Sequence, residues 1–326
     1  MFDHDTPAVP TNFAARVRPT RRVDARFLCY VFAATYALRL NVRSIKQTTG
    51  LQNLDVGAFL AEEWAVPPLS HQVRIADYLD REIARIDALI ERKQALVGFL
   101  HDALTARIAT RIDEASRISV TVRLRRVARV SFSNVDKKTN EGDQSVRLCN
   151  YTDVYERDEI GDDPGFMEAT ATSDQIKRLE LRKEDVLVTK DSETPDDIGV
   201  PAWVPEDLTG VVCGYHLAII RPDQSRLRGD YLFWALRSPM CQSQFSMAAN
   251  GITRFGLRAD ALKEIQVPVP SLGEQAAIAA ELKSAASAAH EAADALTRQV
   301  SLLREHRQAL ITAAVTGQLE VSGNAA

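Results

Sequence analysis

The chain has little that would tie it to a membrane, a disulfide framework or a metal. Its 326 residues include four cysteines that lie far apart and form no CxxC pair, and its six histidines are equally scattered. This spacing gives neither a disulfide scaffold nor a zinc-binding pattern. The most apolar early run, Phe27 to Leu38, is closed by Arg39, is far shorter than a membrane span and follows no signal-peptide pattern. We therefore expect a cytoplasmic protein with no membrane partner, no metal and no cofactor.

Recognisable catalytic motifs are lacking as well. The sequence contains no GxxxxGK[ST] phosphate loop, no GxGxxG, HExxH or GxSxG, and no Asn/Asp-Pro-Pro-aromatic tetrapeptide of the kind that handles a base for methyl transfer. Acidic clusters such as Asp158-Glu159 and Asp191 to Glu193 lack the partners that a metal-dependent nuclease needs. The net charge of -4 argues against indiscriminate coating of nucleic acid but leaves room for a local basic surface. These absences favour a binding module over an enzyme.

What the sequence has instead is a duplication. The element Val66-Pro67-Pro68-Leu69-Ser70-His71-Gln72 returns as Val267-Pro268-Val269-Pro270-Ser271-Leu272-Gly273-Glu274-Gln275. A single offset of 203 residues pairs Pro67 with Pro270 and Gln72 with Gln275. A long charged helix is predicted after each copy, so that a duplicated helix frames whatever lies between.

Both predicted helices carry apolar residues at alternating steps of three and four, which is typical of a coiled-coil seam. Each is about 40 to 45 residues long, or roughly 60 Å. We expect the two helices to be partners within one chain, with large residues such as Ile83 and Ile86 fitting against alanines such as Ala286 and Ala289. The predicted interface residues are Leu79, Ile83, Ile86, Ile90, Val97, Leu100, Leu282, Leu296, Val300 and Leu303. The alternative is an all-helical protein or a homo-oligomeric coiled coil, which the pattern of the intervening segment disfavours.

The segment between the helices changes to short β-type runs. These runs are Val120 to Val130, Val186 to Thr189, Val211 to Cys213 and Leu217 to Ile220. Turn formers separate them, and a helical pattern returns at Asp230 to Leu236 and at Met240 to Met247. We therefore predict a globular α+β domain.

Basic residues in this domain suit nucleic-acid contact. The predicted phosphate contacts are Arg123, Arg125, Arg126, Arg129, Lys137 and Lys138, which occur on a predicted strand and its exit loop. Such contacts position a protein on a duplex without reading its sequence. A solvated strand with alternating charges is the alternative for the arginines.

The loop Asn250 to Arg258 is the better candidate for reading bases. Thr253, Arg254 and Arg258 occur beside glycines, where the backbone can approach a groove closely and arginine can bind guanine edges. A helix-capping or turn role is the alternative. Ser133, Asn134, and Asn150 with Tyr151 are further polar candidates, for which ordinary turn roles are favoured.

The second proline element leads into a helix that ends Arg307-Gln308-Ala309-Leu310-Ile311-Thr312-Ala313-Ala314-Val315-Thr316-Gly317. This combination resembles the specificity subunits of type I restriction-modification enzymes. Lys183 to Val188 and the Gly251 loop are also similar to that family, so the resemblance covers essentially the whole chain. It implies target recognition domains that each read half of a split DNA site, held apart by an antiparallel pair of helices. The expected fold is thus α+β, a globular recognition domain with short strands plus two long helices in an antiparallel intramolecular coiled coil.

The resemblance also implies partners. The chain would be a non-catalytic, sequence-specific subunit that binds double-stranded DNA and directs methylation and cleavage by others. Its helices would dock methyltransferase (modification) subunits, with restriction/translocase subunits joining through the complex. A second copy or a separately encoded half subunit is a further expected partner. One alternative is a truncated assembly fragment that binds methyltransferase or a half subunit and reads DNA poorly alone; another is a stand-alone nuclease.

The repeat predicts unequal domains. Arg18-Pro19 matches Arg221-Pro222 at the offset of 203, Phe27-Leu28 matches Tyr231-Leu232, and Gly50 matches Gly251. Only the C-terminal part of a first recognition domain is therefore expected before the first helix. The expected domains are a remnant at 1–66, a first spacer helix at 67–116, a complete recognition domain at 117–266, a second spacer helix at 267–320 and a tail at 321–326. The first proline element is two residues shorter than the second, and His71 replaces the glutamate that the resemblance implies before Gln72.

Overall fold

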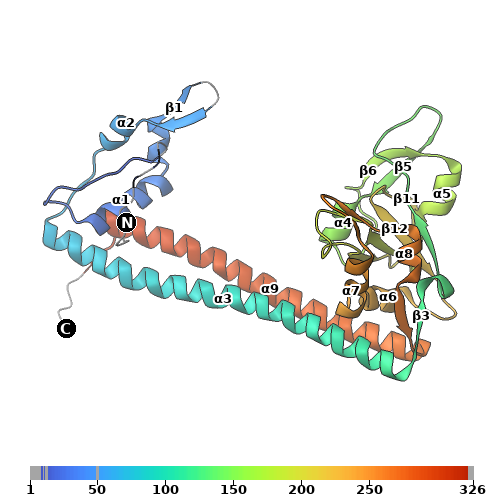
Figure 1. The fold of residues 1–326 in the computed structure, drawn as a ribbon. Coiled ribbons are helices and arrows are strands. Elements are labelled where there is room, and N and C mark those ends of the chain that lie inside the picture. The colour runs from blue at the N-terminus through green and yellow to red at the C-terminus, as the bar shows by residue number, and fades with distance from the viewer. Residues whose placement is uncertain (1–8, 10, 12–13, 49–50, 322–326) are drawn as a thin grey trace. The chain divides into compact units, whose positions relative to one another are not determined.

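The computed structural model describes residues 9, 11, 14–48 and 51–321, and the chain divides into two compact units (Figure 1). Unit 1 comprises Met1–Gly98 and Ala292–Ala326, and unit 2 comprises Phe99–Glu291. The long helices α3 (Leu69–Ile118) and α9 (Leu272–Val315) each contribute to both units. None of the helices described is long and apolar enough to cross a membrane.

Unit 1 joins a short helix and a hairpin to the first part of α3 and the last part of α9. Its other elements are α1 (Ala25–Ala37), a 3-10 turn at Leu40–Ser44, β1 (Ile45–Thr48), β2 (Leu51–Leu54) and α2 (Val56–Leu60). Asp24 begins α1, because its carboxylate accepts hydrogen bonds from the backbone N–H groups of Arg26 and Phe27. The predicted match at Gly50 lies outside the described residues.

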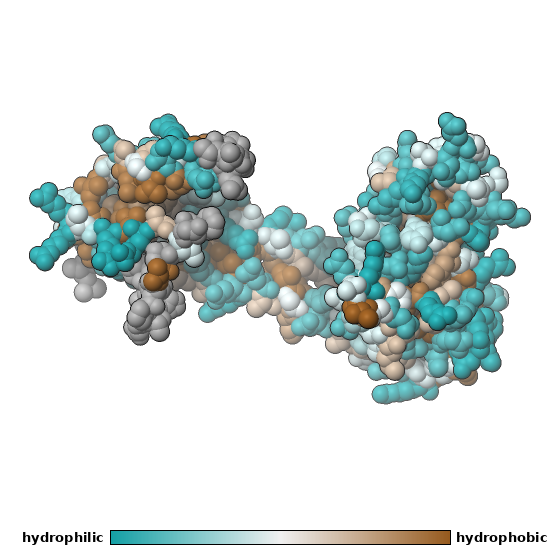
Figure 2. All heavy atoms as spheres, turned by 45° about the horizontal axis from the view of Figure 1, so that its top comes forward, coloured by the Kyte–Doolittle hydropathy of each residue, from teal (hydrophilic) through white to brown (hydrophobic). Residues whose placement is uncertain are grey.

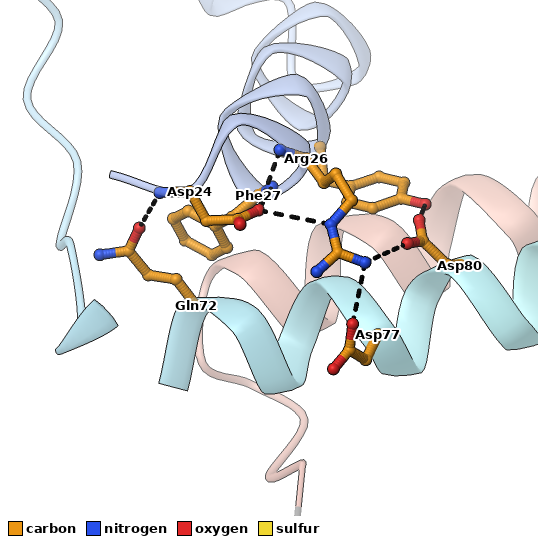
Figure 3. Close-up of polar contacts among 7 residues, drawn as sticks. Asp24, Arg26, Phe27, Gln72, Asp77 and Asp80 are labelled. Atoms are coloured by element: carbon orange, nitrogen blue, oxygen red, sulfur yellow. Dashed lines mark hydrogen bonds and ion pairs between the residues drawn. The ribbon is translucent and has the colours of Figure 1, made fainter. Parts of the chain in front are cut away.

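Helix α1 is fixed on α3 by apolar packing and by a polar network (Figure 3). Phe27 is buried against α3 residues that include Leu79. The Arg26 guanidinium lies 2.8 Å from a carboxylate oxygen of Asp77 and 2.8 Å from one of Asp80. The Tyr30 hydroxyl donates to the other Asp80 oxygen at 2.6 Å.

Unit 2 is built around two four-stranded sheets. Their strand orders are β10-β8-β12-β4 and β6-β5-β11-β7. The strands are β4 (Ala128–Phe132), β5 (Gln144–Cys149), β6 (Met167–Ala171), β7 (Glu180–Leu181), β8 (Val186–Thr189), β10 (Pro201–Trp203), β11 (Leu208–Cys213) and β12 (Leu217–Pro222). Neighbouring strands are antiparallel apart from β5 and β11, which are parallel.

Two smaller sheets and five short helices complete unit 2. Strand β3 (Val120–Arg123) pairs with β15 (Gln266–Val269), and β9 (Asp191–Ser192) pairs with β14 (Phe255–Gly256), which pairs with β13 (Asn250–Gly251). The helices are α4 (Tyr151–Glu156), α5 (Ser173–Leu179), α6 (Gly229–Arg237), α7 (Pro239–Ala248) and α8 (Ala259–Glu264).

The predicted α+β fold with two long helices is confirmed, but the continuous strand expected from Val120 to Val130 is wrong. A 3-10 turn at Leu124–Arg126 divides this run into β3 and β4, which belong to different sheets. Leu124 is fully buried, and its N–H donates to the carbonyl of Ile265 at 2.9 Å. Burial of this one apolar side chain between arginines turns the backbone away from an extended path.

Helices α3 and α9 pack antiparallel in each unit. In unit 1, Asp87 lies 2.9 Å from Arg307, and Lys93 donates to Gln299 at 2.5 Å, so residue numbers rise along one helix and fall along the other. Ile86 and Ile90 form a cluster there with Val300, Leu303 and Leu310.

In unit 2, Leu104, Ile108 and Ile112 share a core with Ile278 and Leu282. The expected fit of isoleucines such as Ile86 against alanines such as Ala286 is wrong. In an antiparallel pair, the start of one helix packs against the end of the other, so residues at matching positions of the two copies do not meet. Ala286 accordingly packs in the unit 2 core. Four residues of the predicted interface are only partly buried: Val97, Leu100, Leu296 and Leu303.

Candidate nucleic-acid interface

Thr253 and Arg254 lie in the tight hairpin between β13 and β14. Gly251 pairs with Phe255 across this hairpin, and a Cβ atom at Gly251 would overlap the carbonyl oxygen of Arg254. A glycine is therefore needed for the loop to close. Pairing of Gly256 with Asp191 attaches the hairpin to β9.

A groove of about 810 Å³ opens beside this hairpin. Its lining residues are Tyr151, Tyr155, Ser192, Glu193, Thr194, Asp197, Thr253 and Arg254. The Tyr155 hydroxyl donates to the carbonyl oxygen of Asp197 at 3.0 Å, and burial together with Asp197 raises the pKa of Tyr155. Arg254 is exposed, and no ion pair holds it among the residues that the structure describes. Its guanidinium is free to donate to an anion or to a base edge.

The structure brings together two of the three predicted base-reading residues. Arg258 is exposed and is the N-cap residue of α8, without a side-chain capping bond. It is not among the residues that line the groove. The groove therefore joins Thr253 and Arg254 with Tyr151 but does not include Arg258.

An aromatic and charged cluster that sequence reasoning missed adjoins the groove at Tyr151. The His216 ring lies edge-on to Tyr151, with centroids 5.6 Å apart, and edge-on to Tyr215, with centroids 5.1 Å apart. Its Nδ1 is 2.9 Å from a carboxylate oxygen of Asp191. The only local signal was the Tyr215-His216 pair in the short turn from β11 to β12, and nothing in the sequence relates that turn to Asp191.

Lys190 packs against the Tyr215 ring of this cluster. Its ammonium donates to the carbonyl of Ser133 at 3.0 Å and lies 4.3 Å from the centroid of the Tyr215 ring. Burial lowers the pKa of Lys190. Ser133 is itself buried, and its hydroxyl donates to the carbonyl of Cys213 at 2.5 Å. Asn150 forms a capping box at the start of α4. This local backbone role agrees with the ordinary turn role that was favoured for it.

The predicted phosphate contacts are divided between the two ends of β4. Arg129 pairs with Arg221 at one end of the β4–β12 ladder, and Phe132 pairs with Ala218 at the other. Lys137 and Lys138 follow the Phe132 end, where the Lys137 ammonium lies 5.9 Å from the Tyr151 ring centroid. Lys137 therefore adjoins the groove through Tyr151, whereas Arg123, Arg125, Arg126 and Arg129 do not line it.

The arginines form a second basic surface. A shallow groove of about 460 Å³ is lined mainly by Arg125, Arg126, Arg129, Arg182 and Arg221, together with Asp223. Two of the predicted contacts are already engaged, because Arg123 and Arg125 lie 3.0 and 2.7 Å from the Glu264 carboxylate. Arg126 and Arg129 are left as the more available cations.

Comparison with known proteins relates this domain to a family. Residues 149–293 match the type I restriction modification DNA specificity domain (Methylase_S). The chain is 24% identical over 284 residues to the type I restriction enzyme EcoBI specificity subunit of Escherichia coli, and this match covers 78% of the chain and 58% of that protein. The chain thus spans less than two thirds of the length of this curated relative.

One solved structure shows the same fold. A structure from work on complex assembly and conformational transition of the type I R-M system aligns with this chain at a TM-score of 0.63 and 17% identity. The alignment covers 91% of this chain and 72% of that one. The HsdS subunit from Thermoanaerobacter tengcongensis aligns at 17% identity with a TM-score of 0.46, covering 91% and 71%. Residues 149–293 thus match a type I DNA specificity domain, and the predicted resemblance to type I specificity subunits is confirmed.

Proposed function

We propose that the chain is a non-catalytic subunit that reads DNA sequence for a type I restriction-modification complex. The observation that carries this proposal is the groove that the exposed Thr253 and Arg254 line together with Tyr151 and Tyr155. A guanidinium and a hydroxyl can bind base edges, and tyrosines offer apolar surface and further hydroxyls. Partner subunits would then carry out methylation and cleavage at the site that the chain selects.

Phosphate contacts would hold the duplex over this groove. Lys137 adjoins it and Lys138 follows in sequence, while Arg126 and Arg129 present charge at the other end of β4. Cations at both ends of a five-residue strand can contact phosphates about one strand length apart, on the order of 15 Å. Such contacts fix orientation, while the groove supplies sequence preference.

Selection from random duplexes by the full chain tests the DNA-reading role. The Arg254→Ala variant should lose base preference at one position, at a cost of about 1 to 3 kcal/mol, whereas Lys137→Ala should weaken binding to all sequences and lower the salt slope by about 1. Arg85→Ala on α3, an exposed arginine of unit 1, is the matched control. If Arg254→Ala and Lys137→Ala bound every duplex as tightly as the parent, these assignments would be wrong.

The long helices are the proposed docking surface for methyltransferase subunits. Large apolar side chains are exposed on them at Leu89, Leu96 and Phe99 of α3 and at Leu302 of α9. Exposed apolar residues along paired helices suit contact with a partner protein. Leu96→Glu and Leu302→Glu should reduce co-purification of a methyltransferase subunit while leaving duplex binding unchanged.

A specific observation also supports the second candidate, an assembly fragment that completes its reading function with another polypeptide. Unit 1 presents apolar surface between hydrophilic residues (Figure 2). A hollow of about 300 Å³ there is lined largely by apolar side chains, among them Phe32, Phe59, Leu60 and Trp64. Duplex selection with and without an added partner chain separates the candidates, because this one requires the partner for a two-part recognition sequence.

A further inference from the structure

His216 presents one ring nitrogen as a fixed hydrogen-bond acceptor. Its Nδ1 lies 2.9 Å from Oδ2 of Asp191. An ionised carboxylate can only accept, so in the neutral imidazole Nδ1 must carry the proton and Nε2 must be the acceptor. Within the described part of the chain no hydrogen bond is made to Nε2.

The imidazole is held in place on the surface. Tyr151 and Tyr215 contact it edge-on at interplanar angles of 85° and 88°, while the Asp191 hydrogen bond prevents the ring from turning over. The His216 side chain keeps 29% of its surface exposed, and Tyr151 and Tyr215 keep 40% and 49%. A fixed acceptor on a partly exposed ring is suited to recognise a donor on another molecule.

The acceptor belongs to the same surface as Arg254. Asp191 faces Gly256 in the β9–β14 ladder, next to the hairpin that carries Arg254. Tyr151 contacts His216 on one side and lines the groove with Arg254. Lys190 contacts the Tyr215 ring, and its hydrogen bond to the Ser133 carbonyl holds the ammonium there. A duplex that contacts Arg254 would therefore meet His216 at the rim of the groove.

We propose that Nε2 of His216 accepts a hydrogen bond from an exocyclic amino group of a DNA base, and that Asp191 is the positioning residue that fixes the imidazole tautomer for this contact. This inference rests on the DNA-reading function proposed above. Adenine and cytosine present amino groups in the major groove and guanine presents one in the minor groove, whereas thymine has none. The pair thus adds a selection for amino-bearing bases to the contacts of Thr253 and Arg254.

Base analogues test this contact directly. In a duplex selected by the full chain, each adenine is replaced in turn by purine, each cytosine by pyrimidin-2-one and each guanine by hypoxanthine, which removes only the amino group. Binding to every duplex is measured at the same pH, about 8. We expect one position at which loss of the amino group weakens binding roughly three- to ten-fold.

Two variants link that position to the pair. His216→Phe keeps a ring between the two tyrosines but has no acceptor, so the position-specific loss should vanish. Asp191→Asn can donate or accept, so the tautomer is no longer fixed and the loss should shrink. Penalties at all other positions should remain. Asp162→Asn is the matched control, because Asp162 forms an exposed ion pair with Arg147 elsewhere in unit 2.

The outcomes separate this inference from the function on which it rests. If the parent chain binds every duplex equally well, both the proposed function and this inference are wrong. A parent that selects a sequence, with amino-group penalties that are the same in His216→Phe and Asp191→Asn, overturns only the inference. Variants with lower melting temperatures but unchanged penalties would show that the pair merely holds the turn before β12, and this result also overturns it.

Discussion

Gln72 and Gln275 make the same set of hydrogen bonds at the starts of the two long helices. The side-chain oxygen of Gln72 accepts from the N–H of Asp24 at 2.9 Å (Figure 3), and its amide nitrogen donates to the carbonyls of Arg22 and Pro67 at 3.1 and 2.7 Å. Both glutamines are almost wholly buried. Each one joins the proline element before its helix to the beginning of a shorter helix.

The second copy repeats this arrangement in unit 2. The Gln275 oxygen accepts from the N–H of Arg228 at 2.9 Å, and its amide nitrogen donates to the carbonyls of Arg226 and Pro270 at 2.9 and 2.8 Å. Arg228 is the N-cap residue of α6, as Asp24 is of α1. The recurrence of Pro and Gln in the sequence therefore reflects one hydrogen-bonded junction built twice.

Replacing Gln275 with leucine should destabilise unit 2 by on the order of 2 to 3 kcal/mol, because a buried N–H and two carbonyls lose their partner. Urea unfolding followed by circular dichroism measures this loss. Gln224→Leu is the matched control, since Gln224 is exposed in the same unit. An unfolding midpoint equal to that of the control would contradict this role.

The buried ion pair of Asp185 with Arg221 supports the second prediction. The fully buried carboxylate binds the guanidinium through two contacts of 2.7 Å and also accepts from the N–H of Arg182 at 2.8 Å. Asp185→Ala leaves a half-buried cation without its counterion and should cost on the order of 3 to 5 kcal/mol.

The exposed pair of Asp162 with Arg147 provides the comparison. Asp162 keeps 62% of its side chain accessible, so Asp162→Ala should cost about 0 to 1 kcal/mol. Both variants are compared by urea unfolding. Equal losses for the two aspartates would mean that burial does not determine the strength of the Asp185 pair.

Elements with a strong local pattern could be predicted from the sequence. The apolar seams and proline elements indicated α3 and α9 because these helices are long and periodic. The runs around Val186 and Leu217 indicated β8 and β12 because buried strands need continuous apolar side chains. The turn at Leu124 was not predictable from composition, since it depends on one side chain entering a core that is formed largely by distant residues.

The candidate interface was only partly accessible to such reasoning. Glycines identified the Arg254 loop, because a close backbone approach is a local property. The joining of Tyr151, Asp191 and His216 depends on strand pairing between segments far apart in the chain. Neutralisation of Arg123 by Glu264 likewise has no local signal, so a run of arginines overstated the number of available phosphate contacts.

The four thiols should differ sharply in reactivity. Burial raises the pKa of Cys241 to about 12 and also raises the pKa values of Cys149 and Cys213, whereas Cys29 is exposed on α1. The buried groups stay protonated and shielded, and the thiolate is the reactive form. Iodoacetamide at about pH 8 should therefore add one label to the native chain and four after unfolding in urea, counted by mass spectrometry. More than one rapid label on the folded chain would contradict the buried positions.

Gly251 should matter for recognition more than for stability. It is exposed, so alanine there removes no core packing, but the added Cβ would overlap the Arg254 carbonyl and force the hairpin open. Gly251→Ala should therefore lose much of the base preference that Arg254 provides, about 1 to 3 kcal/mol at one position in duplex selection.

Gly98→Ala, in the interior of α3, is the control, because a Cβ atom there meets no atom within 4 Å. This variant should be more stable by roughly 0.5 to 1 kcal/mol and should keep its recognition unchanged. Unchanged base preference in Gly251→Ala would show that the closed hairpin is not what presents Arg254 to DNA.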